Sequence, residues 1–279
     1  MKLSVSRSAI VSALFISTLN LAPCAFGQNP KSPGDVLTPT VRGSIDKETE
    51  KRIGVPTGSA PRLKNGKPDM SGVWNPPYVG DVTKSGNGQT GEPELPFTAR
   101  GLAEWNAYDA AKDGDYTGSC LPFGLMRNMN APHPIQLIQN DNYIAYLFEQ
   151  SSWFHAVPTD GRPHPKNIDQ TWHGNSVGHW EDDTLVIDTI GFNGKTRMDT
   201  IGHPASDRLH IIERLQRIDA GHIAYELTYD DKLYYTRPWK NSRIFTLRPD
   251  WEIMEYACEE NNKDITEGHI KKWTGATTR

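Results

Sequence analysis

The side chains best suited to acid–base chemistry gather in residues 161–189, GRPHPKNIDQTWHGNSVGHWEDDTLVIDT, which contain His164, His173 and His179. An imidazole changes its charge near neutral pH, so it can donate or accept a proton, and in its neutral form it can bind a transition metal. A proline on each side of His164 stiffens the backbone there, and a rigid backbone keeps a catalytic side chain in place. The stretch therefore predicts acid–base catalysis, with metal binding as an alternative.

A carboxylate on a later predicted strand can act together with these histidines. In residues 209–218, Glu213 shares one strand face with three aliphatic side chains, so it interrupts an apolar row. Desolvation raises the pKa of such a carboxylate towards the range of a general acid or base, although structural ion pairs with arginines are the alternative. We predict that His164 and Glu213 form the acid–base pair of one polar pocket. Five further residues are expected to orient or polarise the ligand: His210, Asp160, Arg162, His173 and His179.

Aromatic and polar side chains are expected to wall the same pocket, and those predicted to contact the ligand are Trp172, Trp180, Ser176 and Arg237. Ser176 lies in Gly-Asn-Ser-Val-Gly, which matches the G-x-S-x-G pattern of a hydrolase nucleophile. That nucleophile requires a preceding strand and a following helix, which these residues do not predict, so a glycine-rich turn is expected instead. The predicted activity is that of a hydrolase, lyase or isomerase acting on a small, partly apolar, aromatic or sugar-like molecule.

The histidines also fit a second possibility, a metal-dependent enzyme. The candidate ligands of a divalent transition metal such as zinc, copper or iron are His164, His173 and His179. Further histidines that could join them are His155, His203 and His210. Because their spacing does not fix two ligands on one helix or strand, only the fold could bring them together.

Hydrophobic alternation with period two predicts a mainly β protein around this site. One helix is expected near residues 98–112, with Thr98 as its N-cap and Gly114 after its end. Short turns separate the later strands, as in an antiparallel meander, and a barrel or strongly curved sheet would hide the strand edges. The predicted strands span residues 143–150, 184–190, 209–218, 222–230, 242–248 and 252–258.

The N-terminus predicts export. Lys2 and Arg7 accompany an apolar run, and small residues follow at the positions that a signal peptidase reads, so residues 1–27 are interpreted as a signal peptide. Pro23 argues against lipid anchoring at Cys24. The mature protein is therefore expected in the bacterial periplasm or outside the cell.

The mature chain divides into two parts. Residues 28–68 are rich in Pro, Gly and Ser and lack apolar periodicity, which predicts a disordered tail or linker. Residues 69–279 are expected to form a single β-rich domain. Its two cysteines, Cys120 and Cys258, would pair in an oxidising compartment, so a disulfide is predicted.

Charge and hydropathy exclude some classes of partner. The full chain has 30 basic and 34 acidic residues, and loss of the signal peptide removes two of the basic ones, so the mature net charge is −6. Nucleic-acid binding requires a basic excess, so none is predicted. The mature sequence has no apolar run of the roughly 20 residues that a transmembrane helix needs. A small molecule is the expected partner, and the sequence leaves the oligomeric state open.

Two resemblances bear on function. Gly72-Val73-Trp74 resembles the Gly-x-Trp signature at the first strand of lipocalins, where the tryptophan plugs one barrel end, and this implies a non-catalytic ligand-binding protein as the alternative to an enzyme. Residues 61–264 also resemble a widespread family of exported bacterial proteins to which no activity is attached. The patterns that carry this resemblance are DGRPHP (160–165), SVGxWExDTLV (176–186), LHIIER (209–214) and YTRPW (235–239).

Overall fold

The computed structural model describes residues 45–260, 262–268 and 273, all within a unit that spans residues 37–279. The predicted signal peptide, Cys24 and the first part of the predicted tail lie outside the described residues. Within the described part of the chain, no helix combines the length and the apolar character that a bilayer crossing needs.

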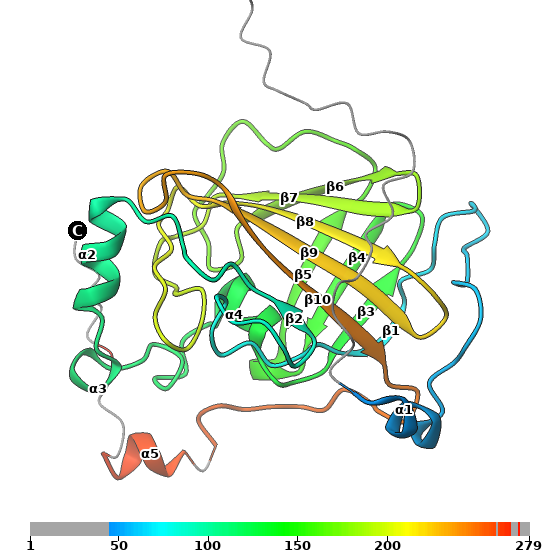
Figure 1. The fold of residues 1–279 in the computed structure, drawn as a ribbon, viewed down its shortest axis with the longest axis horizontal. Helices are drawn as coiled ribbons and strands as arrows, with labels where there is room; N and C mark the ends of the chain where they lie inside the picture. The colour runs from blue at the N-terminus through cyan, green and yellow to red at the C-terminus, as the bar shows by residue number, and fades with distance from the viewer. Residues whose placement is uncertain (1–44, 261, 269–272, 274–279) are drawn as a thin grey trace, which may run out of the picture. The chain divides into compact units, whose positions relative to one another are not determined.

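Antiparallel strands form one curved sheet (Figure 1). Nine of them follow the order β5-β4-β3-β1-β10-β9-β8-β7-β6, and β2 pairs with β10. The two end strands, β5 and β6, also contact each other, so the sheet forms a nearly closed barrel and the predicted fold class is confirmed. The strands are β1 (Gly72–Asn75), β2 (Gln89–Thr90), β3 (Ile135–Gln139), β4 (Tyr143–Phe148), β5 (Trp153–Pro158), β6 (Asn175–Glu181), β7 (Thr184–Ile190), β8 (His210–Arg217), β9 (His222–Asp230) and β10 (Trp239–Leu247).

The alternation of side chains along each strand separates an inner from an outer face of the sheet. On β8, every second residue from Ile211 to Arg217 is buried, and the residues between them are partly exposed. Glu213 lies opposite Ile187 of β7 in the register, so both belong to the inner face. Large side chains fill the space inside the sheet, and the bulkiest fully buried ones include Trp74, Trp239, Arg243, Tyr146, Tyr225 and Tyr229.

The Gly-x-Trp segment lies on β1, as the sequence predicts for a first strand. The Trp74 indole is fully buried and donates a hydrogen bond from Nε1 to the Met70 carbonyl oxygen at 3.0 Å. The Arg217 guanidinium lies over the same ring, 5.0 Å from its centroid. Trp74 therefore joins the first strand to the end of β8.

The barrel closes between β5 and β6 through side chains, since no backbone ladder joins these two strands among the described residues. Gly178 of β6 lies close to β5: a Cβ atom at this position would lie 3.2 Å from the carbonyl oxygen of Pro158. The absence of a side chain at Gly178 thus permits the two end strands to approach. We call this line of contact between β5 and β6 the seam.

The helix predicted over residues 98–112 is found as two short helices. Thr98 is the N-cap, as predicted, and its hydroxyl accepts a hydrogen bond from the Gly101 N–H at 3.0 Å. The first helix ends before Tyr108, because Asp109 caps a new helix by accepting from the Ala111 N–H at 3.0 Å. The helical elements are α1 (Lys47–Ile53), α2 (Ala99–Ala107), α3 (Ala110–Asp113), α4 (Gly124–Asn130), the 3₁₀ helix η1 (Gln150–Ser152) and α5 (Lys263–Thr266).

Two predicted segments differ in the structure. Residues 252–258 are extended but pair with no strand; the Met254 N–H donates to the Glu149 carboxylate, and Tyr256 bonds with Ser152 through its backbone. Their alternation therefore reflects an extended segment that lies outside the sheet. Residues 175–181, expected to be part of a loop, form β6.

The predicted tail also differs from the structure over its described part, residues 45–68. Asp46 caps α1, and Glu50 of that helix contacts His222 of β9 at 3.1 Å. Arg62 forms a two-bond ion pair with Asp183. Polar contacts fix this segment, and the hydrophobic periodicity on which the prediction depended does not report such contacts.

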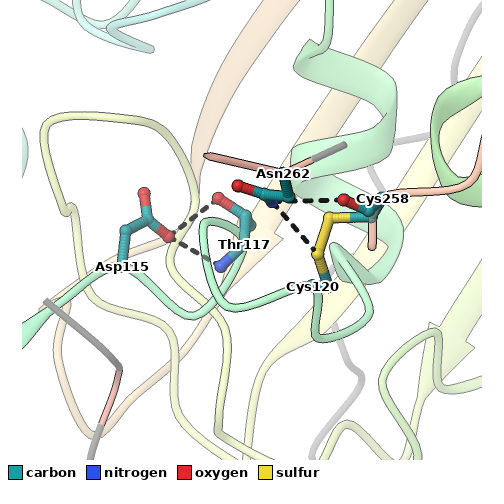
Figure 2. The surroundings of a disulfide bond; sticks show 5 residues. All are labelled: Asp115, Thr117, Cys120, Cys258 and Asn262. Carbon is teal, nitrogen blue, oxygen red and sulfur yellow. Dashed lines mark hydrogen bonds between the residues drawn. A yellow bond between two sulfur atoms is a disulfide. The ribbon is translucent and has the colours of Figure 1, made fainter. Parts of the chain in front are cut away.

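The predicted disulfide is confirmed: Cys120 is bonded to Cys258, with their Cα atoms 5.5 Å apart (Figure 2). The side-chain amide of Asn262 donates to the Cys258 carbonyl oxygen at 3.1 Å and lies 3.5 Å from the Cys120 sulfur. The bond holds the segment that follows β10 against the loop before α4.

Candidate functional site

One group of predicted residues comes together on the outer face of β6, β7 and β8. Asp188 Oδ1 lies 3.0 Å from His164 Nε2 and 2.9 Å from His210 Nε2. The other ring nitrogen of His164 lies 2.8 Å from Asn175 Oδ1. Partial burial raises the pKa of Asp188, but hydrogen bonds from His210 and His164 outweigh this and lower it overall. We call His164, Asp188 and His210 the outer cluster; their side chains are 18%, 35% and 37% exposed.

Glu213, the predicted partner of His164, lies on the opposite face of the sheet. It is fully buried, and its carboxylate accepts a hydrogen bond from the Tyr225 hydroxyl at 2.7 Å. Burial raises the pKa of Glu213 to about 7, against the opposing effects of the Tyr225 and Tyr146 hydroxyls. Asp188, which His164 contacts, lies opposite Ile212 and shares its face of the sheet. Glu213 follows Ile212 on the strand and therefore faces the other way. The structure thus does not bring His164 and Glu213 together.

Two other histidines lie inside the sheet near the seam. His155 of β5 contacts the Ser176 hydroxyl of β6 at 2.8 Å, and this hydroxyl contacts that of Thr189 at 2.6 Å. The Ser176 hydroxyl thus links the His155 ring to the Thr189 hydroxyl. His173 contacts the Asn128 side chain at 2.9 Å.

These seam histidines are poor general bases at neutral pH. Burial and then the neighbouring His173 lower the pKa of His155 to about 3, and burial lowers the pKa of His173 to about 4. Both rings are therefore neutral, and a base of such low pKa accepts a proton weakly. Ser176 lies within β6, and its hydroxyl contacts His155 and Thr189, whereas Asp188 and His210 contact each other on the outer face, so the described residues form no Ser-His-Asp triad around it.

The predicted polar residues of the loop and of residue 237 form exposed ion pairs. Asp160 and Arg162 pair through several hydrogen bonds, which lower the pKa of Asp160 to about 2. His179 lies 3.4 Å from Glu181 of the same strand, and Arg237 lies 2.8 Å from Glu92. Water and salt screen such exposed pairs, so they contribute little to stability.

The two predicted tryptophans lie apart from each other. Trp172 stacks on Tyr116 with ring centroids 5.9 Å apart, and the Lys195 ammonium lies 6.0 Å from the centroid of the Trp172 ring. Trp180 packs against the hydrophobic core, with the Lys67 ammonium 5.7 Å from its ring centroid. Among the described residues, no contact joins either tryptophan ring to the outer cluster.

A pocket of about 480 Å³ lies elsewhere, between the loops on either side of β2, the last turn of α2 and the loop that precedes β8. This volume lies within the range of small-molecule sites. Residues that line it are Asp81, Thr83, Lys84, Pro93, Glu94, Leu95, Phe97, Trp105, Ile201 and His203. One wall is aromatic: Trp105 stacks on His203 with centroids 4.9 Å apart and on Phe97 at 5.4 Å.

His203 is the residue of this pocket best suited to acid–base chemistry. Its Nδ1 donates to Asp199 Oδ2 at 2.5 Å, so in the neutral imidazole the lone pair lies on the remaining nitrogen, Nε2. Among the described residues no hydrogen-bond partner is found for Nε2, and His203 lines the pocket with a side chain that is 1% exposed. Asp199 is fully buried and also accepts from the backbone N–H groups of Val82, Gly202 and His203. These bonds fix the carboxylate that orients the imidazole.

The same pocket holds the best-placed candidate metal ligands. Asp81, Asp199 and His203 each offer one ligand atom within 4.8 Å of the others, and no other group of three such side chains is found in the described ranges. Asp199 already accepts four hydrogen bonds, so the atoms that remain for a cation are those of Asp81 and His203 Nε2. The predicted metal candidates His164, His173 and His179 do not form such a group.

No protein-family model and no curated protein matches this chain. The choice among its polar clusters therefore depends on geometry and burial.

The Asp199–His203 pair was largely missed by the sequence prediction. His203 was named only as a further metal ligand, and Asp199 was not named. The signal that could have found them is Asp199-Thr-Ile-Gly-His203: an aspartate can turn the backbone by accepting from N–H groups two to four residues later, and here it accepts from Gly202 and His203. Such a turn brings the side chain of a following histidine back to the aspartate.

Proposed function

We propose that the chain is an exported enzyme that performs acid–base chemistry on a small ring compound in the pocket lined by Trp105. His203 is the general base and then the general acid, and Asp199 positions it. The observation that carries the proposal is a fully buried carboxylate bonded to Nδ1 of an imidazole that lines a pocket and whose other nitrogen has no partner among the described residues. Export is supported by the sequence of residues 1–27 and by the disulfide, because disulfides persist in oxidising compartments.

The proton transfer that this pair supports is simple. Nε2 of His203 takes a proton from a substrate hydroxyl, from an acidic C–H group or from a water molecule, and the imidazolium returns it to the leaving group or to another atom of the substrate. The buried Asp199 carboxylate holds the required tautomer and stabilises the imidazolium that forms. Hydrolysis, elimination and isomerisation all fit this sequence of steps.

The pocket pair is favoured over the outer cluster on burial. The Asp199 and His203 side chains are 0% and 1% exposed, whereas those of the outer cluster are between 18% and 37% exposed. Water competes less for a buried pair, so its hydrogen bond holds the imidazole more firmly. The outer cluster also lies outside the pocket described above.

Turnover of a compound library tests the proposal. The mature protein and the variants His203→Gln and Asp199→Asn would be incubated with hydroxylated and aromatic ring compounds, and conversion would be followed by mass spectrometry. We expect His203→Gln to lose activity by about 10²–10⁴-fold, as for removal of a general base. The variant His164→Gln is the matched control in the outer cluster and should keep wild-type activity. Activity that disappears in His164→Gln and survives in His203→Gln would refute the assignment.

A metal-dependent enzyme is the second candidate, and the proximity of Asp81 to His203 favours it. His203 Nε2 with Nδ1–H donating to Asp199 has the orientation that metal-binding histidines commonly show. Zinc retained after dialysis by the wild type, and lost in both Asp81→Asn and His203→Gln, would support this candidate. Equal metal content in all three proteins would exclude these residues as ligands.

The ligand-carrier alternative receives less support. A lipocalin-type carrier holds its ligand inside the barrel. Here fully buried side chains such as Trp239, Arg243 and Tyr229 occupy the interior of the sheet. The pocket that we favour lies outside the sheet, beside α2.

A further inference from the structure

The polar side chains of the pocket are mainly hydrogen-bond acceptors. Asp81 and Glu94 contribute carboxylates, and His203 contributes the lone pair of Nε2. The Thr83 hydroxyl already donates to Asp81 Oδ1 at 2.6 Å. A ligand that satisfies these acceptors must itself carry O–H or N–H donors.

The charges of the lining are also unbalanced. Lys84 is the only cation among the lining residues, its side chain is 75% exposed, and it lies 3.9 Å from Asp81 Oδ2. Glu94 is exposed and has no ion pair among the described residues, and the buried Asp199 carboxylate lies directly behind His203. An anionic ligand would therefore face two lining carboxylates and a third behind them, with one solvated ammonium to offset them. Like charges brought together in this way oppose binding.

The apolar part of the lining suits a flat ring. Phe97, Trp105 and the His203 imidazole form an aromatic cluster in which each ring contacts the other two, with centroids between 4.9 Å and 6.2 Å apart. Leu95 and Ile201 extend the apolar surface. Aromatic faces and edges contribute large apolar contact area to sugar rings and to aromatic rings alike.

We infer that the ligand of this pocket is a neutral ring that carries two or more hydroxyl groups, and that the pocket discriminates against carboxylated and phosphorylated rings. The inference rests on the proposed function for the role of this ligand as substrate. One hydroxyl would donate to Nε2 of His203, the atom that removes its proton, and others to Asp81 and Glu94. A sugar and a dihydroxylated aromatic ring share this chemistry.

Calorimetric binding to the mature protein tests the inference with two matched pairs of probes. The sugar pair is methyl β-glucoside and methyl β-glucuronide, and the aromatic pair is catechol and 3,4-dihydroxybenzoate. In each pair the second compound carries a carboxylate. We expect the neutral member of at least one pair to bind about tenfold or more tightly than its anionic partner. The pair that binds assigns the ring as sugar or aromatic.

Glu94→Lys is the decisive variant, because Glu94 is exposed and we expect its replacement to leave the fold intact. It should shift the preference towards the anionic member by about tenfold or more. Glu48→Lys makes the same charge change on α1, which lies across the molecule from α2 in Figure 1, and should leave the preference unchanged.

Three results would overturn the inference: no binding of either pair, tighter binding of the anionic members by the wild type, or equal shifts in Glu94→Lys and Glu48→Lys. Failure of the proposed function looks different. If His203→Gln and the wild type share the preference for neutral rings but no compound is turned over, the ligand class stands and the catalytic role of His203 falls. If a carboxylated ring is the compound turned over with His203 required, the catalytic role stands and the ligand class falls.

Discussion

Glu213 makes the stability of the protein depend on pH in an unusual direction. Burial raises its pKa to about 7 from an ordinary value of 4.5. Between these two values the folded protein binds a proton that the unfolded chain has lost, so stability falls as the pH rises. A difference of about 2.5 pKa units corresponds to about 3 kcal/mol, which is fully lost once the pH exceeds 7.

The substitution Glu213→Gln tests this directly. A glutamine keeps an oxygen that can accept from the Tyr225 hydroxyl, as the carboxylate does at 2.7 Å, and it does not ionise. The variant should therefore gain stability relative to the wild type as the pH rises, by about 2–3 kcal/mol between pH 5 and pH 8. Urea unfolding of both proteins at several pH values measures this difference. The titrating groups that the two proteins share contribute equally to both free energies of unfolding, so their contributions cancel.

Glu226→Gln is the matched control, because it removes a carboxylate from the outer face of β9, where Glu226 pairs with the exposed Lys240. Its effect should stay within about 1 kcal/mol at every pH. If Glu213→Gln and Glu226→Gln showed the same pH profile, the reasoning from burial would be refuted.

Three further predictions concern other parts of the fold. Because the pKa of His155 is lowered to about 3, stability that is present above its ordinary pKa of 6.5 is lost on acidification. Between pH 6.5 and pH 4, His155→Gln should therefore lose about 3 kcal/mol less free energy of unfolding than the wild type, measured by urea unfolding. An equal loss in both proteins would contradict this. Cys258→Ser should destabilise the protein by about 2–4 kcal/mol in calorimetry, and a reductant should abolish the difference from the wild type. Trp74→Ala should reduce the free energy of unfolding by about 3–5 kcal/mol, and a loss below 1 kcal/mol would show that this end of the core repacks.

Alternating strands were the part of the fold that the sequence predicted best. The predicted strand 222–230 has the same bounds in β9, and 209–218 differs from β8 by one residue at each end. These strands have one buried and one partly exposed face, which produces a clear period of two. β6 was missed, because its glycine, its serine and its polar outer residues hide that period. The buried helix α4 was missed for a related reason: all its residues are buried, so it lacks an amphipathic pattern.

The candidate site was predicted only in its type of chemistry. The sequence predicted histidines and carboxylates as functional groups, which stays a prediction, and the helix that it predicted over residues 98–112 includes Trp105, which lies in α2. It could not show that Glu213 and His164 lie on opposite faces, because the assignment of faces for the loop residue His164 depends on tertiary packing. Nor could it show that Asp199 folds back onto His203, since that contact comes from one irregular turn.

The seam is the line along which the barrel can open most easily. Everywhere else around the circuit, separating neighbouring strands breaks a row of main-chain hydrogen bonds. In the part of the chain that the structure describes, no such row joins β5 to β6: His155 contacts Ser176, and just after β5 the Gly161 N–H donates to the Gly178 carbonyl oxygen. Amide protons on the facing edges of these strands should exchange with deuterium sooner than those at the centre of β8 and β9. A small solute that reaches the interior would enter along this line, with the rest of the circuit still hydrogen-bonded.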